Sequence, residues 1–173
     1  MEKTEIANWK CRYRLEKRHG DIDAFKTPEG RKTFLEGTLP YEVKEGEGNC
    51  LLNTGIDEMW NMVTGVVSGA DHIFDNTAAT IGVGDSETEA AAAQTDLQAV
   101  TNKKYNAMEA TYPTSTAQKV TFKSSFGSDE ANYAWHEWVV RQSTSEKCLN
   151  RKVESLGTKT TGTWTLEISI TLS

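Results

Sequence analysis

Two segments near the ends of the chain alternate strictly between apolar and polar residues. Residues 9–15 read WKCRYRL and residues 164–172 read WTLEISITL, so every second side chain is apolar in both. Side chains two positions apart lie on the same face of a β-strand. Each segment is therefore predicted to be a strand with one buried face and one polar face.

Four further segments favour strands. Residues 78–84, 120–126 and 148–156 are short runs with regularly placed apolar residues, and residues 133–141 carry two tryptophans and two valines on both faces. Apolar residues on both faces indicate a strand that is covered on both sides. Short strands joined by Gly, Ser, Asn and Thr turns predict a mainly β fold, an antiparallel β-sandwich that is jelly-roll-like or barrel-like.

Two short helices are predicted beside the strands. In residues 48–65, Asn53 or Thr54 can cap a helix and Gly65 can end it. The apolar residues of this helix recur at helical spacing and form one face, which contains Ile56, Met59, Trp60 and Val63.

The second helix is predicted within residues 85–104. Ser86 and Glu89 fit a capping box, and four alanines follow them. Leu97 and Val100 are its sizeable apolar residues, so we expect it on the surface or at one end of a sheet.

The segment 16–48 is polar, rich in glycine and contains Pro28 and Pro40. Long irregular segments are uncommon inside compact domains and often make contacts. We therefore predict an N-terminal strand and extended arm over residues 1–47, followed by a β-sandwich domain over residues 48–173.

Charge and cysteine content narrow the classes of function. The net charge is −6 and the isoelectric point is about 5.2, which argues against nucleic acid or an anionic membrane as partner. The charged N-terminal sequence lacks the apolar region of a signal peptide, and no apolar run has the length of a membrane span. Cys11, Cys50 and Cys148 are widely spaced and form no CxxC pair, so reduced thiols are expected in a cytoplasmic setting.

Candidate chemistry centres on Ser86 in the sequence GVGDSETE, which resembles the nucleophile turn of GDSL-type esterases. That mechanism needs a histidine to accept the serine proton, and in that family it comes from a C-terminal Asp-x-x-His. None of His19, His72 and His136 belongs to such a motif. We favour a turn and a helix cap here, and keep the esterase as an alternative.

Metal and sugar binding are the other chemical alternatives. Asp71, His72 and Asp75 lie within five residues but lack the spacing of a metal motif, so polar loop residues are expected and neither metal nor cofactor is predicted. The five tryptophans suit core or interface packing better than a sugar platform. Trp138 lies out of register with Trp135 and is predicted to be exposed, which keeps a carbohydrate-binding module as an alternative.

Several blocks of residues 48–172, taken in order, resemble small virion structural proteins of tailed bacteriophages. The blocks are GNCLLNTGIDEMW (48–60), ATIGVGDSETEAAAAQTDLQA (79–99), YP (112–113), VTFKSSFGSDEANYAWHEW (120–138), LNR (149–151) and GTKTTGTWTLEISITL (157–172). The resemblance implies a virion protein that folds in the host cytoplasm and works through subunit contacts, and it supplies no catalytic residues.

The expected function is that of a head decoration, or cement, protein on the outer capsid. The alternative is a tail, neck or fibre-attachment protein of the same virion, and homo-oligomers are expected in both cases. Partners would be the major capsid protein or tail and neck proteins. The predicted contact residues are apolar anchors of the arm, basic residues for an acidic partner, and one tryptophan: Tyr13, Phe25, Phe34, Leu39, Tyr41, Arg12, Arg14, Arg18 and Trp138.

Overall fold

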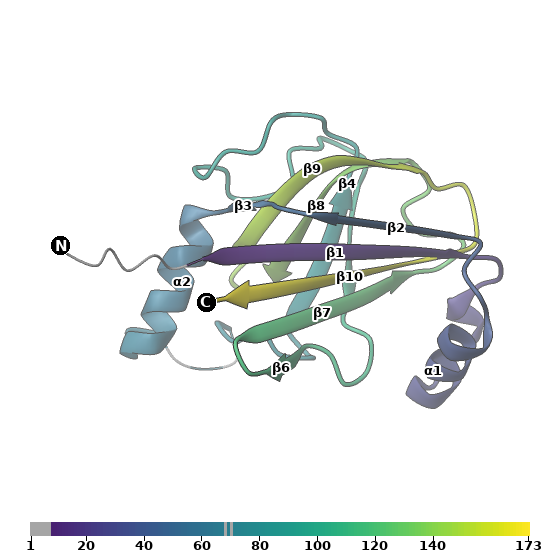
Figure 1. Ribbon diagram of the computed structural model, residues 1–173, viewed down its shortest axis with the longest axis horizontal. Helices are drawn as coiled ribbons and strands as arrows, with labels where there is room; N and C mark the ends of the chain where they lie inside the picture. Colours follow the sequence, from purple (N-terminus) through teal and green to yellow (C-terminus); the bar gives the residue numbers. More distant parts are fainter. Residues whose placement is uncertain (1–7, 68, 70) are drawn as a thin grey trace.

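The structure is a computed structural model that describes residues 8–67, 69 and 71–173. Two five-stranded antiparallel sheets pack together as a β-sandwich (Figure 1). Strands make up 43% of the chain and helices 15%. The predicted antiparallel β-sandwich is confirmed, and it carries two helices, one of them at a position that was not predicted.

The first sheet joins strands from both ends of the sequence. Its strands are, in spatial order, β2 (Glu42–Glu47), β1 (Trp9–Arg18), β10 (Thr163–Leu172), β7 (Lys119–Phe126) and β6 (Thr114–Thr116). Cys11 lies opposite Ile170, and Leu15 lies opposite Leu166. The two segments with the strictest alternation are thus neighbours at the centre of this sheet.

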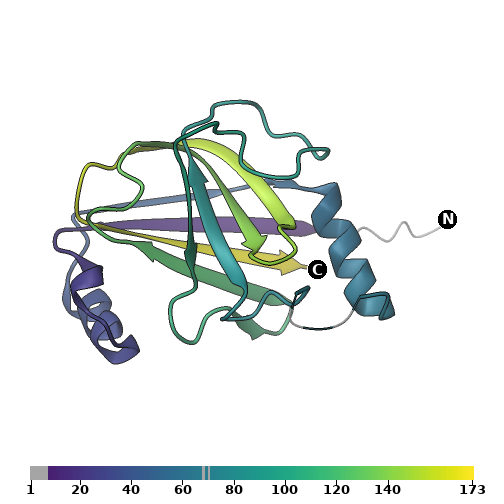
Figure 2. The same cartoon turned by 180° about the vertical axis from the view of Figure 1, so that it is seen from behind.

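The second sheet contains the strand with apolar residues on both faces. Its strands are, in spatial order, β3 (Cys50–Leu51), β9 (Cys148–Thr158), β8 (Ala134–Gln142), β4 (Ala79–Gly84) and β5 (Lys103–Ala107). Figure 2 shows this sheet from behind the view of Figure 1. β8 is buried on both faces, as predicted, and lies between β9 and β4.

The main core fills the space between the sheets. The inward rows of β1 and β10 contain Tyr13, Leu15, Leu166 and Ile168, all nearly inaccessible to solvent. The opposite sheet contributes residues such as Ile81, Val83, Trp135, Trp138 and Val140. Full burial of one such side chain contributes roughly 1.5–3 kcal/mol, so the alternating rows account for the sandwich.

The N-terminal segment belongs to the sandwich, which corrects the predicted extended arm. β1 pairs with β10 over ten residues, and β2 adds to the other side of β1 as an edge strand. Strand pairing satisfies the backbone polar groups, so this polar segment is ordered without a large apolar core of its own. Residues 1–7 of the predicted arm lie outside the described residues.

One helix agrees with the prediction in position. α2 spans Asn53–Thr64 and ends at Gly65, which adopts the left-handed conformation that favours glycine. The N-cap is Leu52 and makes no side-chain cap, so the predicted caps by Asn53 or Thr54 are wrong. Within the described part of the chain, no helix is long and apolar enough to cross a membrane.

The other helix lies where the arm was expected. A 3-10 turn, η1 (Ile22–Ala24), precedes α1 (Pro28–Gly37), whose N-cap Thr27 accepts a hydrogen bond from the Gly30 N–H. The predicted helix in residues 85–104 is absent: residues 85–102 form a loop and β5 follows. Ser86 caps no helix, and its hydroxyl accepts from the Thr88 N–H instead.

A buried ion pair explains why the alanine-rich segment is a loop. The Arg151 Nε donates to the Glu137 carboxylate at 2.7 Å, and neither side chain is exposed. The loop surrounds this pair, because the Gln98 and Ala99 N–H groups donate to Glu137 while the Gln94 amide oxygen accepts from Arg151. Removing one partner of a buried pair costs roughly 3–5 kcal/mol, which exceeds the helix preference of a few alanines.

Candidate functional site

Most of the exposed large apolar side chains lie near the two helices of the molecule. Figure 1 places α2 at one end of the long axis, and η1 and α1 at the other. The first group, here called the α2 patch, contains Trp60, Val63 and Val66. The second, here called the α1-end patch, contains Phe25, Leu39, Tyr41 and Val43. Contiguous exposed apolar surface marks sites that bind other macromolecules, so these two groups are the candidate contact surfaces.

The α2 patch is carried by a helix whose first turn is fixed to the second sheet. A Cβ on Gly55 would lie 2.5 Å from the Leu149 carbonyl oxygen, so helix and strand backbones are in close contact. The Thr54 hydroxyl donates to the Cys148 carbonyl at 3.1 Å. Trp60 and Val63 follow at a spacing of three and are 62% and 75% exposed. The predicted apolar face of this helix is therefore divided: Trp60 and Val63 are turned to solvent, whereas Ile56 and Met59 are half-buried, Met59 against the main core.

The α1-end patch combines aromatic contacts with a fully exposed leucine. The Phe25 and Phe34 rings lie 5.4 Å apart, and Phe34 is half-buried against Gly20. Tyr41 stacks on His19 with ring centroids 4.6 Å apart. Leu39 lies between Phe34 and Tyr41 in the sequence, and its side chain is 86% exposed.

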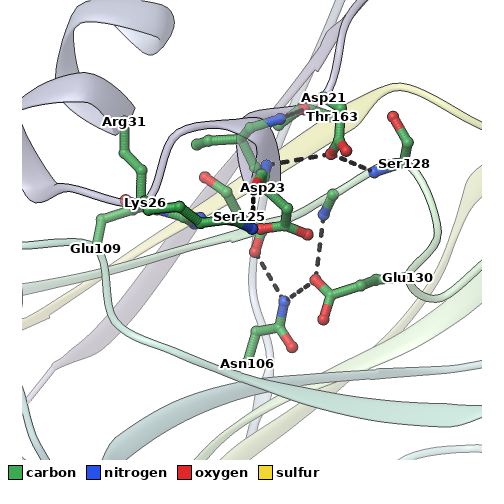
Figure 3. A network of polar contacts seen from close by, with 12 residues as sticks. Asp21, Asp23, Lys26, Arg31, Asn106, Glu109, Ser125, Ser128, Glu130 and Thr163 are labelled. Atoms are coloured by element: carbon green, nitrogen blue, oxygen red, sulfur yellow. Dashed lines mark hydrogen bonds and ion pairs between the residues drawn. The ribbon is translucent and has the colours of Figure 1, made fainter.

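A network of charged and polar side chains attaches η1 and α1 to the sandwich (Figure 3). Arg31 of α1 donates to Glu109 through Nη2 at 2.6 Å and to Asp23 through Nη1 at 3.0 Å. The Asp21 carboxylate accepts the N–H groups of Asp23 and Ser128, and this lowers its pKa, with the Ser128 bond as the main cause. α1 has no buried residue, so these polar contacts and the Phe25–Phe34 contact hold it.

The network continues into the turn after β7. The Glu130 carboxylate accepts from the Asn106 amide and from the Gly127 N–H. Burial alone would raise the pKa of Glu130, but the donors from Asn106 and Lys104 outweigh it and the pKa is lowered. Lys159 is fully buried beside this turn and donates to the Gly127 carbonyl at 2.6 Å. Burial lowers the pKa of Lys159, while the charge of Glu130 opposes that shift.

The predicted basic contact residues are all paired with glutamates of the chain itself. Arg12 is exposed and pairs with Glu47 at 2.7 Å, and Arg14 pairs with Glu45 and Glu16. Arg18 is 5% exposed and pairs with Glu16. Tyr13 faces the core, so its predicted role as an exposed anchor is wrong.

Trp138 is fully buried, which corrects its predicted exposure. The register between β8 and β9 shifts between Trp135 and Glu137, so a bulge interrupts the alternation of the strand. Trp135 and Trp138 therefore both reach the main core, where Trp138 contacts Tyr13 at 6.0 Å between ring centroids. Trp138 cannot serve as a platform for a sugar while it is in this position.

The residues of the esterase alternative are not assembled. Within the described residues, the Ser86 hydroxyl makes its hydrogen bonds with Thr88, and the nearest ion-pair contact of His136 is with Glu87 at 3.4 Å. Ser86 also lies in a loop, without the helix N-terminus that would supply oxyanion donors.

The residues of the metal alternative make local hydrogen bonds. His72 Nδ1 lies 2.6 Å from the Glu58 carboxylate of α2, and the Asp75 carboxylate accepts from Thr77 and Ala78. No group of three metal-ligating side chains occurs among the described residues.

The three cysteines are free thiols, and burial raises the pKa of Cys11 to about 12, so this thiol is protonated and unreactive.

Sequence reasoning missed α1 and the network that holds it. Thr27 followed by Pro28 and Glu29 is a helix-start signal, since Thr caps well and Pro suits the first turn. That signal could have placed α1. The partners of Arg31 lie 8 and 78 positions away in the chain, and no local pattern indicates them.

Comparison with known proteins gives no relative. No protein-family model matches the chain, and neither a curated protein nor a solved structure matches it.

Proposed function

We propose that this chain is a non-enzymatic structural protein of a tailed-phage virion, which binds the outer capsid as a decoration protein. The observation that carries the proposal is the pair of apolar patches, one beside each of the two helices that Figure 1 shows at opposite ends of the sandwich. A protein that clamps two neighbouring capsomers needs two separate contact surfaces. The α2 patch and the α1-end patch supply such surfaces.

The composition of the patches suits subunit contacts. Trp and Tyr are frequent among the residues that contribute most to protein interfaces, and each patch contains one, Trp60 or Tyr41. The sandwich between the two patches consists of two antiparallel sheets that share a core. It can therefore hold the two patches at a fixed separation.

A tail, neck or fibre-attachment role in the same virion is the second candidate, because a ring of copies would also use two surfaces, one for each neighbour. Copy number separates the two roles. A decoration protein is present in hundreds of copies on each particle, whereas a tail or neck protein is present in a handful to dozens.

The test uses phage particles from which the gene for this chain has been deleted. Purified protein is added back, and bound copies are counted by electron microscopy and quantitative gel analysis. We expect Trp60→Ser and Leu39→Ser each to lower occupancy, and the double variant to abolish binding, because each removes an anchor from one patch.

Val100→Ser is the matched control, since Val100 is 90% exposed but belongs to neither patch. It should bind like the unmodified protein. Normal occupancy by the double variant, or a complete lack of binding by the unmodified protein, would contradict the proposal.

A further inference from the structure

A groove of about 560 Å³ lies on the outer face of the first sheet. β10 forms its floor, where Ser169 and Thr171 have short side chains between the longer side chains of β1 and β7. Lys10, Thr171 and Lys119 lie opposite one another in the strand register, and the residues next to them face the core. These three side chains therefore share the outer face.

The cations of this groove are only partly neutralised by the chain itself. Its charged lining residues are Lys10, Arg12, Arg14, Lys119, Glu45, Glu47 and Glu167. Lys10 and Arg12 share the single carboxylate of Glu47, and within the described residues Lys119 makes no ion pair. The backbones of Lys10 and Lys119 lie two strand spacings apart, roughly 10 Å, with Thr171 and no carboxylate between them in the register.

The outer face of the second sheet carries the opposite charge. Val139 of β8 packs with Leu97 in an apolar cluster outside the main core. The loop of residues 85–102, here called the acidic loop, therefore lies over the outer face of this sheet. It contains four acidic residues, no Lys and no Arg. The views of Figures 1 and 2 are from the sides of the first and the second sheet, respectively.

The acidic loop presents two carboxylates from a fixed backbone. Glu87 and Glu89 are exposed. Glu87 contacts His136 at 3.4 Å, and within the described part of the chain Glu89 makes no ion pair. The fully buried Arg151 donates to the carbonyl of Thr88, the residue between the two glutamates, at 2.9 Å. This bond holds the loop in place while both carboxylates face solvent.

We propose that the groove binds the acidic loop of a second copy of this chain, so that copies associate head to tail. Lys10 and Lys119 of one copy pair with Glu87 and Glu89 of the next. Both surfaces belong to ordered backbone, so little conformational freedom is lost when they meet. Because groove and loop lie on opposite faces, a copy bound through its loop still offers its groove to a third. Such contacts build rings or filaments.

Charge selects this orientation over others. Each copy has a net charge of −6, so contacts between most parts of two copies are repulsive. Charges beyond about 8–10 Å are screened at moderate salt, so the groups in direct contact decide the orientation. Exposed ion pairs contribute little individually, and we expect weak association that is sensitive to salt. This contact goes beyond the proposed function, because it joins copies of the chain and uses neither apolar patch.

The first test is the oligomeric state of the purified, unmodified protein. Analytical ultracentrifugation measures its average mass over a range of protein concentrations at low and at high salt. At low salt the mass should rise with protein concentration and pass that of a dimer. Added salt should return it toward the monomer.

Two double variants test the two surfaces. The groove variant is Lys10→Gln with Lys119→Gln, and the loop variant is Glu87→Gln with Glu89→Gln. Each should weaken association by about tenfold, because each removes two ion pairs from the contact. The loop variant lowers the net negative charge, so overall repulsion alone would strengthen its association.

The matched control is Lys32→Gln with Glu36→Gln, an exposed pair on α1 that lies outside the contact. It should associate like the unmodified protein. Equal urea midpoints for all these variants show that the substitutions leave the fold intact.

Mixing the two variants tests the head-to-tail geometry. The groove variant retains a functional loop, and the loop variant retains a functional groove. An equimolar mixture should therefore form dimers that grow no further, whereas each variant by itself stays largely monomeric.

Several results would overturn the proposal: an unmodified protein that stays monomeric at low salt, stronger association of the loop variant, or a mixture that behaves like its separate components. Association that persists at high salt and is lost in Trp60→Ser would also overturn it, because that result assigns the contact to the α2 patch.

Discussion

The two ends of the sandwich hold their helices by different physical means. α2 is fixed by close backbone contact, with Gly55 packed directly on Leu149 of β9. α1 buries no residue completely and is attached through Arg31, its two acidic partners and one aromatic contact. The helix at one end is therefore held by close packing, and the helix at the other end mainly by ion pairs.

This difference predicts different responses to the same disturbance. Close packing has almost no dependence on pH or salt, whereas ion pairs weaken as salt rises and as carboxylates become protonated. The α2 patch should remain a fixed surface under conditions that loosen the α1-end patch. A clamp with one rigid contact and one adjustable contact could tolerate variation in the spacing of its partners.

The largest expected effect is at the α2 end. Gly55→Ala places a methyl group 2.5 Å from the Leu149 carbonyl oxygen, so helix and strand must separate. We expect a loss of roughly 1–3 kcal/mol in the free energy of unfolding, as for overpacking in a core. Urea denaturation followed by tryptophan fluorescence measures it.

Gly37→Ala at the end of α1 is the matched control, because nothing lies within 4 Å of the added Cβ. It should be neutral or stabilise the protein by roughly 0.5 kcal/mol. Equal losses for Gly55→Ala and Gly37→Ala would show that the two helices are not held differently.

A smaller effect is expected when the charged attachment of α1 is removed. Arg31→Met deletes the contacts with Glu109 and Asp23, and it should cost about 1 kcal/mol, the upper end of what exposed ion pairs contribute. The loss should be local, so hydrogen exchange should speed up in α1 but not in α2. Lys32→Met, which changes an exposed residue of the same helix, should leave exchange unaltered.

The smallest effect is expected from pH, and it also belongs to the α1 end. The folded-state pKa values of Asp21 and Glu130 are lowered. Their contribution to stability is therefore present when the pH is above their unfolded-state pKa values, and it is lost as the pH falls through the folded-state values. The urea midpoint should therefore decrease when the pH falls below about 4.

Asp21→Asn tests the origin of that pH dependence, since it keeps an acceptor for the Ser128 N–H but removes the titrating group. The gap in urea midpoint between this variant and the unmodified protein should be present at neutral pH and should shrink as the solution is acidified. A gap that stays constant with pH would assign the acid sensitivity to other groups.

Local sequence patterns determined the strands that line the core and the end of α2. Period-two alternation makes one face of β1 and of β10 apolar, and burying that face is favourable against almost any partner sheet. Gly65 ends α2 because a left-handed conformation is easy for glycine. These features depend on neighbours in the chain, so the sequence predicts them well.

Tertiary structure alone decided the positions that depend on distant partners. A bulge opposite β9 turns Trp138 into the core, and the buried Glu137–Arg151 pair draws the alanine-rich segment into a loop. The pairing of β1 with β10, more than 140 residues away, builds the expected arm into the sheet. In each case the decisive energy comes from contacts between segments far apart in sequence, which the pattern within any one segment does not contain.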